Sequence, residues 1–245
     1  MDTVVQNQEN RLLRSVRFSL RFVVVIWIVH IFQVLTTMDL GYLGLYPRTV
    51  FGLRGIAFAP LLHGDFQHLI SNSVPFFVMT TMLFFFYKRV ANKSFWMMYL
   101  LTGIAVWAMG RSVFHIGLSG VVYALAGFMV FSGFFRRNLK AIILSLIVVF
   151  LYGGMIWGVL PIQPGVSWES HLLGGIVGIL TAYWYKEDIE ADEVKEKYSW
   201  ETEPEQLENQ YFFERDIFDK TKTERQREKE NGLPSWFSSK TWREE

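Results

Sequence analysis

Six apolar stretches, each about as long as a bilayer is thick, constrain this chain more than any other feature of its sequence. A helix needs roughly 20 mostly apolar residues to cross a membrane. Because the bilayer core offers the backbone no water, each such segment must satisfy its own hydrogen bonds. The sequence therefore predicts an all-α membrane protein with a bundle of six transmembrane helices. The predicted spans are residues 18–37, 66–87, 94–110, 118–135, 140–160 and 169–185.

Charge is distributed unevenly along the chain. Residues 186–245 hold 18 of the 23 acidic and 11 of the 24 basic residues, a net charge of −7, whereas residues 1–185 have a net charge of +8. We expect a cytosolic N-terminal segment at residues 1–16, a six-span domain at residues 17–185 and an acidic cytosolic tail at residues 186–245. The polar tail with scattered aromatic residues predicts a disordered extension or a short amphipathic helix.

The basic residues of the loops predict the orientation. On the side opposite the N-terminus only Arg48, Arg54 and Arg111 occur, against eleven on the N-terminal side. Basic loops stay in the cytosol, so we expect both termini there, in a bacterial inner membrane. The first apolar run is too long for the apolar core of a signal peptide, so we expect it to be a retained helix. The eleven basic residues are Arg11, Arg14, Arg17, Arg21, Lys88, Arg89, Lys93, Arg136, Arg137, Lys140 and Lys186.

Several kinds of chemistry are disfavoured by composition. The chain has no cysteine, which excludes disulfides, thiolate metal sites and cysteine nucleophiles. Asp39, Asp65 and Glu169 are the acidic residues within or beside the spans, and they lie far apart in the sequence. A dinuclear carboxylate site is therefore not expected, and we predict no cofactor and no bound metal.

Four polar residues stand near the starts of the predicted second, fourth and sixth spans. They are His68 and Asn72, then Ser119, then His171. Such groups are costly in a membrane and usually face the bundle interior or a wet cavity. With a cytosolic N-terminus these three spans all begin at the external face, so the four residues are predicted to lie at a similar depth.

Ser119 lies between glycines, in Gly117-Leu118-Ser119-Gly120. A serine in an apolar helix most often bonds to a backbone carbonyl one turn earlier, which is one interpretation here. The other is a nucleophile at a helix start, where free N–H groups favour negative charge and glycines allow close approach. The motif differs from the Gly-x-Ser-x-Gly elbow of soluble hydrolases, since Val121 replaces the second glycine.

The other polar residues have a structural interpretation beside the functional one. His171 shares a helix face with Gly174 and Gly178, a small-xxx-small pattern typical of close helix packing. It could also be the general base that a serine needs. His68 and Asn72 lie on one helical face, and could clamp two helices together or donate hydrogen bonds to an oxyanion.

Tyr123 and three further histidines are less informative. Tyr123 follows Ser119 by one helical turn, so it could support the His171 imidazole or simply belong to the core. We expect His63 to cap or line the entrance, and His30 and His115 to be structural.

Taken together, three segments resemble the rhomboid family of intramembrane serine proteases. They are residues 63–72 (HGDFQHLISN), 117–123 (GLSGVVY) and 171–178 (HLLGGIVG), which occur in family order on the second, fourth and sixth spans. The resemblance covers about residues 10–185. The external segment 38–65 resembles the membrane-embedded first loop of that family, with Tyr46-Pro47-Arg48 in place of a Trp-Arg pair.

The resemblance implies a Ser119 nucleophile and a His171 general base, a dyad without an acid. It also implies that His68, Asn72 and the backbone N–H of Ser119 hold the oxyanion. Tyr123 would pack against His171. Gly117 and Gly120 would, with Tyr123, shape the substrate pocket and support the dyad.

The function expected from this resemblance is cleavage of transmembrane or membrane-proximal segments through an acyl-enzyme. The expected partners are the lipid bilayer and transmembrane protein substrates, and not nucleic acid. One alternative is an inert rhomboid-like protein that binds transmembrane helices. Another is a small transporter or channel, which would favour intramembrane charge relays or inverted repeats that the sequence does not show.

Overall fold

The computed structural model describes residues 2–162, 165–190 and 220–232, and in these residues it is all-helical. It contains eight α-helices, several short 3-10 helices and one isolated bridge between Leu45 and His115. The chain divides into two units, Met1–Val194 and Lys195–Glu245. The all-α class predicted from the sequence is therefore confirmed.

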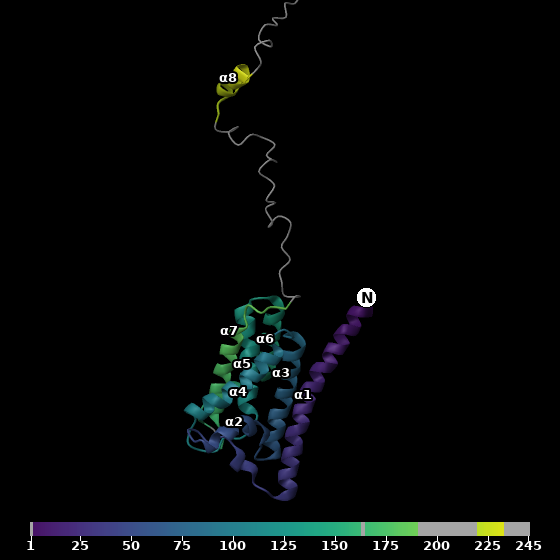
Figure 1. Ribbon diagram of the computed structural model, residues 1–245, viewed down its shortest axis with the longest axis vertical. Coiled ribbons are helices and arrows are strands. Elements are labelled where there is room, and N and C mark those ends of the chain that lie inside the picture. Colours follow the sequence, from purple (N-terminus) through teal and green to yellow (C-terminus); the bar gives the residue numbers. More distant parts are fainter. Residues whose placement is uncertain (1, 163–164, 191–219, 233–245) are drawn as a thin grey trace, which may run out of the picture. The chain divides into compact units, whose positions relative to one another are not determined.

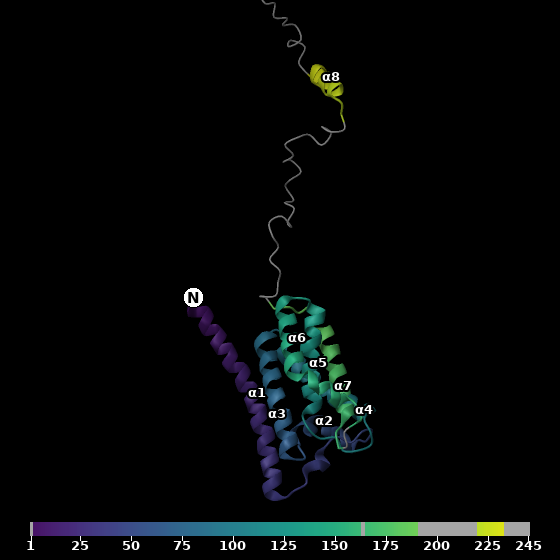
Figure 2. The same ribbon diagram turned by 180° about the vertical axis from the view of Figure 1, so that it is seen from behind.

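The first unit is a bundle of long helices. Figures 1 and 2 show them side by side, with the short elements after α1 gathered at the end where α1 stops and α3 begins. This end is the external one in the predicted orientation. The α-helices are α1 (Asp2–Thr36), α2 (Gly55–Phe58), α3 (Phe66–Phe86), α4 (Ala91–Met109), α5 (Ser119–Arg136), α6 (Leu139–Tyr152) and α7 (Trp168–Trp184). The 3-10 helices are η1 (Leu40–Leu43), η2 (Phe51–Arg54), η3 (Ala59–Leu61) and η4 (Gly153–Val159).

Four helical stretches of the described chain are long and apolar enough to cross a membrane. They are Gln8–Thr36, Phe66–Phe86, Ser119–Arg136 and Leu139–Val159. The predicted spans 94–110 and 169–185 are also helical, as α4 and α7, but do not meet this standard. The reason lies in their first turns. The first turn of α4 contains Asn92 and Lys93, whereas α7 has only 17 residues and its first turn contains Glu169-Ser170-His171.

Helix α5 lies at the centre of the bundle, in contact with α3, α4, α6 and α7. Half of its apolar stretch (50%) is buried, compared with 17% for α1 and 11% for Leu139–Val159. Helix α1 and the stretch Leu139–Val159 expose large apolar side chains such as Leu35 and Phe150. Such faces suit a hydrocarbon surrounding, whereas the central position of α5 allows it to carry polar groups.

Helix α1 packs along α3 through a mixed interface. The indole Nε1 of Trp27 donates to the hydroxyl of Ser73 at 3.1 Å, and the Thr81 hydroxyl donates to that of Ser19 at 3.0 Å. Interhelical hydrogen bonds of this kind supplement dispersion contacts when helices associate in lipid. They hold α1 against the helix that carries His68 and Asn72.

The segment between α1 and α3 is anchored by Arg48. Its two terminal nitrogens donate to the Gly110 carbonyl at 2.7 Å and to the Ser112 hydroxyl at 2.8 Å. Next to it, the Trp107 indole donates to the Thr49 carbonyl at 2.8 Å. Arg48 thus fixes the segment between α1 and α3 to the α4–α5 connection.

In the second unit the structure describes one helix, α8 (Lys222–Gly232). Thr221 and Glu224 cap it reciprocally, because the Thr221 N–H donates to the Glu224 carboxylate at 2.8 Å and the Glu224 N–H donates to the Thr221 hydroxyl at 3.4 Å. No large apolar side chain occurs in α8, so it has no apolar face. The predictions for residues 191–219 and 233–245 lie outside the described residues and stay predictions.

Candidate active site

Ser119 is the first residue of α5, directly after a backbone turn that requires glycine. Gly117 has φ +106°, a conformation that residues with a side chain rarely adopt. The turn places the Ser119 N–H in the first turn of α5, where N–H groups have no acceptor within the helix. The Ser119 hydroxyl and the Ser119 backbone N–H group are therefore both located at the start of α5.

The Ser119 hydroxyl is not used by its own helix. Ser15, Ser19 and Thr181 each donate to the carbonyl four residues earlier, the ordinary behaviour of a helical hydroxyl. Within the described chain the Ser119 hydroxyl makes no such bond and none to His171, and it is partly exposed. Catalytic hydrogen bonds are often loose before substrate binds.

Glycines bring α5 and α7 into backbone contact beside Ser119. A Cβ on Gly174 would lie 2.1 Å from the Gly120 carbonyl oxygen, and one on Gly178 would lie 2.0 Å from the Ala124 carbonyl oxygen. Neither distance is sterically possible, so the observed separation of the helices needs glycine at both positions. The small-xxx-small face predicted for Gly174 and Gly178 therefore packs against the helix that carries the serine.

His171 lies in the first turn of α7, and its side chain is buried. Its Nδ1 lies 2.8 Å from the Gly158 carbonyl oxygen. Because a carbonyl can only accept, Nδ1 must carry the proton in this contact, and in the neutral ring Nε2 is then the basic nitrogen. The arrangement leaves His171 with the protonation pattern that a general base requires.

Tyr123 lies flat against this imidazole. The two ring centroids are 4.2 Å apart and the ring planes differ by 9°. The Tyr123 hydroxyl donates to the Met155 carbonyl at 2.6 Å. Since Tyr123 follows Ser119 by one turn of α5, the stack places the His171 ring beside the helix start that bears the serine.

His68 and Asn72 converge on Gly117 from α3. A Cβ on Gly117 would lie 2.7 Å from His68 Nε2 and 3.8 Å from Asn72 Nδ2. Asn72 is 5% exposed, and its Nδ2 has no hydrogen-bond partner. An amide N–H group that has no partner within the described protein is free to donate to a ligand group.

Two residues at the site were not recognised from the sequence. The buried His63 ring accepts, at Nε2, a hydrogen bond from the Leu118 N–H at 3.4 Å, so it supports the turn before Ser119 rather than the entrance. Gly158 contacts both His171 and Tyr123. The proximity of His63 to His68 in the sequence was a usable signal, but nothing marked Gly158 among its neighbours.

The two carboxylates near the site, Glu169 and Asp65, bind groups other than His171. Glu169, which is buried, forms an ion pair with Arg111, whose second nitrogen donates to it at 3.1 Å. Asp65 caps α3 by accepting from the His68 N–H at 2.7 Å. In the described residues His171 therefore has a backbone carbonyl as its Nδ1 partner, and no carboxylate.

His115 links the segment between α1 and α3, the α4–α5 connection and the residue before α7. Its backbone pairs with Leu45, its Nδ1 contacts the Ser167 hydroxyl at 2.5 Å, and its Nε2 contacts the Arg111 carbonyl at 3.0 Å. Burial lowers the pKa of His115, which favours the neutral ring with the Nε2 proton directed at that carbonyl. The structural role expected for His115 agrees with these contacts.

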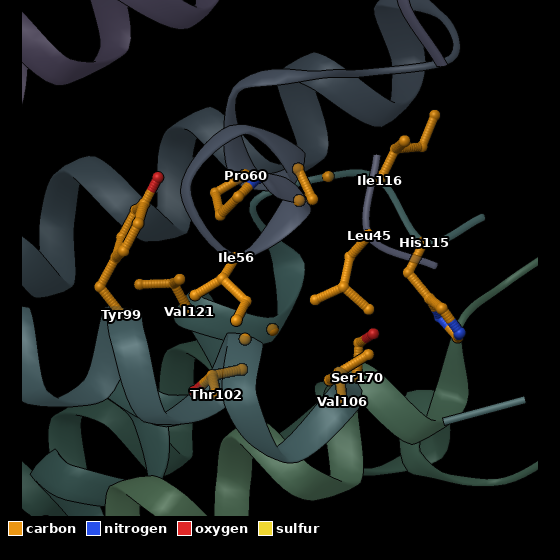
Figure 3. A pocket seen from close by; sticks show the side chains of 15 residues that line it. Leu45, Ile56, Pro60, Tyr99, Thr102, Val106, His115, Ile116, Val121 and Ser170 are labelled. Atoms are coloured by element: carbon orange, nitrogen blue, oxygen red, sulfur yellow. The ribbon is translucent and has the colours of Figure 1, made fainter. Parts of the chain in front are cut away.

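A small cavity of about 40 Å³ adjoins the serine turn. Gly117 and Gly120 line it, although Ser119 and His171 do not. Figure 3 shows side chains that line this cavity, among them Thr102 of α4 and Ile56 and Pro60 of the segment between α1 and α3. The described residues contain no group of three or more His, Cys, Asp or Glu side chains that could hold a metal ion.

Comparison with known proteins identifies the family. The profile of the Rhomboid domain matches residues 50–187, more than half of the chain. The chain belongs to the rhomboid family. The resemblance seen in the sequence is thereby confirmed, and all the residues discussed above as parts of the rhomboid site lie inside the matched region.

Similar proteins occur in mycobacteria. An uncharacterized protein of Mycobacterium tuberculosis (strain ATCC 25618 / H37Rv) is 32% identical over 176 residues, which are 67% of this chain and 72% of that protein. An uncharacterized protein of Mycobacterium leprae (strain TN) is 35% identical over 177 residues, 67% of this chain and 68% of that protein. The names of these bacterial relatives assign no activity.

Proposed function

We propose that this rhomboid is an intramembrane serine endopeptidase that cleaves transmembrane or membrane-proximal segments of other membrane proteins. The main support is the environment of His171. Its Nδ1 faces the Gly158 carbonyl and its ring stacks on Tyr123, so Nε2 is the basic nitrogen beside the start of α5. A serine hydroxyl that is not bonded to its own helix needs a base of this kind to act as a nucleophile.

The proposal includes six membrane spans and a cytosolic location of both termini. Helices α4 and α7 would complete the set of six, since each packs against helices that are apolar enough to span. The external loop between α1 and α3 would lie partly in the membrane. Its exposed Val50, Phe51 and Phe58 suit an apolar surrounding. The proposed limits are residues 1–16 for the N-terminal segment, 17–185 for the catalytic domain and 186–245 for the cytosolic tail.

Acylation would begin when Ser119 Oγ attacks the scissile carbonyl carbon. The hydroxyl proton passes to Nε2 of His171, and a tetrahedral oxyanion forms. The Ser119 N–H, His68 and Asn72 are the proposed donors to this anion, and the unpaired Nδ2 of Asn72 supports that role. His171 then gives its proton to the leaving amine as the peptide C–N bond breaks.

Deacylation would use the same groups. His171 takes a proton from water as the water oxygen attacks the ester carbonyl of the acyl-enzyme. The second tetrahedral anion occupies the same donors, and its collapse restores the Ser119 hydroxyl. No step requires a metal or cofactor, and the proposed partners are the lipid bilayer and transmembrane protein substrates.

The decisive test compares Ser119→Ala with Ser132→Ala in purified protein reconstituted into bilayers of bacterial lipids. Both serines lie on α5, and the Ser132 hydroxyl is buried without a partner, so its loss should be harmless. We expect Ser119→Ala to abolish cleavage of a transmembrane test substrate and Ser132→Ala to cleave normally. A Ser119→Ala protein with wild-type activity would refute the assignment.

A fluorophosphonate probe separates this proposal from an inert helix-binding relative. The enzyme should be labelled at Ser119, which peptide mass spectrometry of the adduct would identify. An inert relative would bind transmembrane helices without being labelled and without cleaving them. That result would show that the protein is a helix-binding protein and not a protease.

A further inference from the structure

The 3-10 helix η4 supplies two backbone carbonyls to the site. The Met155 oxygen accepts from the Tyr123 hydroxyl at 2.6 Å, and the Gly158 oxygen lies 2.8 Å from His171 Nδ1. The two side chains bound in this way are those that stack on each other at 4.2 Å. One short segment thus binds both members of the stack.

The Gly158 carbonyl occupies the position that a carboxylate has in a serine–histidine–aspartate triad. There the acid binds Nδ1–H, fixes the tautomer and the ring orientation, and stabilises the imidazolium. A neutral carbonyl can also fix the tautomer and the ring orientation. It stabilises the imidazolium only through its dipole. Glu169, the nearest acidic residue in sequence, is paired with Arg111, so this carbonyl is the Nδ1 partner that the structure shows.

Position 158 has no room for a side chain. A Cβ there would lie 2.0 Å from the Tyr123 hydroxyl oxygen and 3.1 Å from His171 Nδ1. Gly154, in the same 3-10 helix, has nothing within 4 Å of the corresponding point. The two glycines are therefore a matched pair, one crowded by the site and one facing open space.

We propose that Gly158 is a positioning residue for His171, an inference that rests on the proteolytic function proposed above. Its carbonyl keeps the proton on Nδ1, and its missing side chain lets the Tyr123–His171 stack come within hydrogen-bond reach of η4. The residue acts through His171 and makes no contact with substrate.

The first test is the tautomer of His171 in the full-length protein labelled with nitrogen-15 histidine. The chain has five histidines, so the His171 resonances are assigned from their absence in His171→Asn. We expect a protonated Nδ1 and an unprotonated Nε2 in the wild type and in Gly154→Ala. A wild-type His171 with its proton on Nε2 would overturn the proposal, even where Gly158→Ala fails to fold.

The second test is kinetic. Displacing a catalytic group by about 1 Å can cost on the order of 10²-fold in rate, so Gly158→Ala should lower kcat by about this factor with KM nearly unchanged. Gly154→Ala should retain the wild-type kcat. A folded Gly158→Ala protein with the wild-type tautomer and kcat would also overturn the proposal.

A double variant tests the cause of the loss. Tyr123→Phe removes the oxygen that a Cβ at position 158 would meet at 2.0 Å. Combining it with Gly158→Ala should therefore restore part of the activity, a coupling that independent effects would not produce. If the proposed function is wrong, the wild-type protein will neither react with fluorophosphonate nor cleave a substrate. If only the role of Gly158 is wrong, the wild-type protein will react and cleave, but the tautomer or the kcat comparison will give the contrary result.

Discussion

His63 accepts a hydrogen bond from the backbone N–H of Leu118, with 3.4 Å between His63 Nε2 and the Leu118 nitrogen. The imidazole comes from the loop before α3 and is fully buried, whereas Leu118 immediately precedes Ser119. A ring that accepts at Nε2 must be neutral there. Burial is the main cause that lowers the pKa of His63 from 6.5 to about 3, and the neighbouring His68 and His30 lower it further.

This pKa predicts a dependence of stability on pH. Between about pH 6.5 and 3 the unfolded chain binds a proton at His63 and the folded chain does not, so the free energy of unfolding falls as the pH drops through this window. The slope for one proton is at most about 1.4 kcal/mol per pH unit. His63→Gln keeps an acceptor for the Leu118 N–H and removes the titration.

The measurement is unfolding of wild type and His63→Gln in detergent micelles at several pH values. We expect the wild type to lose more stability than the variant from pH 6.5 downward, and the two curves to run parallel above it. Equal pH dependence of both proteins would show that His63 does not titrate as described.

Asn72→Ala should separate activity from stability. The buried Nδ2 of Asn72 makes no hydrogen bond to another described residue, so removing the amide breaks no bond within the protein and should leave the free energy of unfolding nearly unchanged. Loss of one oxyanion donor should lower kcat on the order of 10²–10³-fold. Thermal unfolding and cleavage rates of the same preparation check both statements, and a variant that is strongly destabilised would contradict them.

The contact between α5 and α7 predicts opposite effects of alanine at neighbouring positions. Gly178→Ala should destabilise the protein by about 1–3 kcal/mol, since its Cβ would overlap the Ala124 carbonyl. Gly175→Ala meets nothing within 4 Å and should be neutral, or stabilising by up to about 1 kcal/mol through helix propensity. Unfolding midpoints in detergent measure the difference, and equal midpoints would argue against close packing at Gly178.

Arg48→Lys should loosen the segment between α1 and α3. Lysine keeps the charge but cannot reproduce the two-pronged contact with the Gly110 carbonyl and Ser112, so we expect a loss of about 1 kcal/mol. Ser112→Ala removes one of these contacts and should cost less. Limited proteolysis of the 38–65 segment, followed by mass spectrometry, would detect the change. Faster cleavage in Ser112→Ala than in Arg48→Lys would be inconsistent with this anchoring.

Much of the architecture follows from local patterns in the sequence. Apolar runs of bilayer length predicted the positions of all six long helices, because the backbone in lipid has few alternatives to a helix. The alternating direction of the spans predicted that His68, Ser119 and His171 lie at a similar depth. The spacing of Gly174 and Gly178 predicted a packing face, since residues four apart lie on the same side of a helix.

Other features depended on what lies next to a residue in space. Gly154 and Gly158 belong to the same 3-10 helix, and only their surroundings distinguish the open position from the crowded one. Glu169 directly precedes Ser170 and His171 in the sequence, yet its carboxylate pairs with Arg111 and leaves the imidazole to a backbone carbonyl. The role of His63 likewise depends on a hydrogen bond from the N–H of Leu118, which is 55 positions away in the sequence.

The sequence by itself therefore determined the helical class and the rhomboid family, and it predicted the set of polar residues near the starts of α3, α5 and α7. All of these depend on residue type and periodicity. The tertiary structure decided how those residues are held. Backbone carbonyls and N–H groups are the same in every residue, so their directions carry no signature in the sequence. Only the packing of η4, α5 and α7 shows that a glycine carbonyl binds His171.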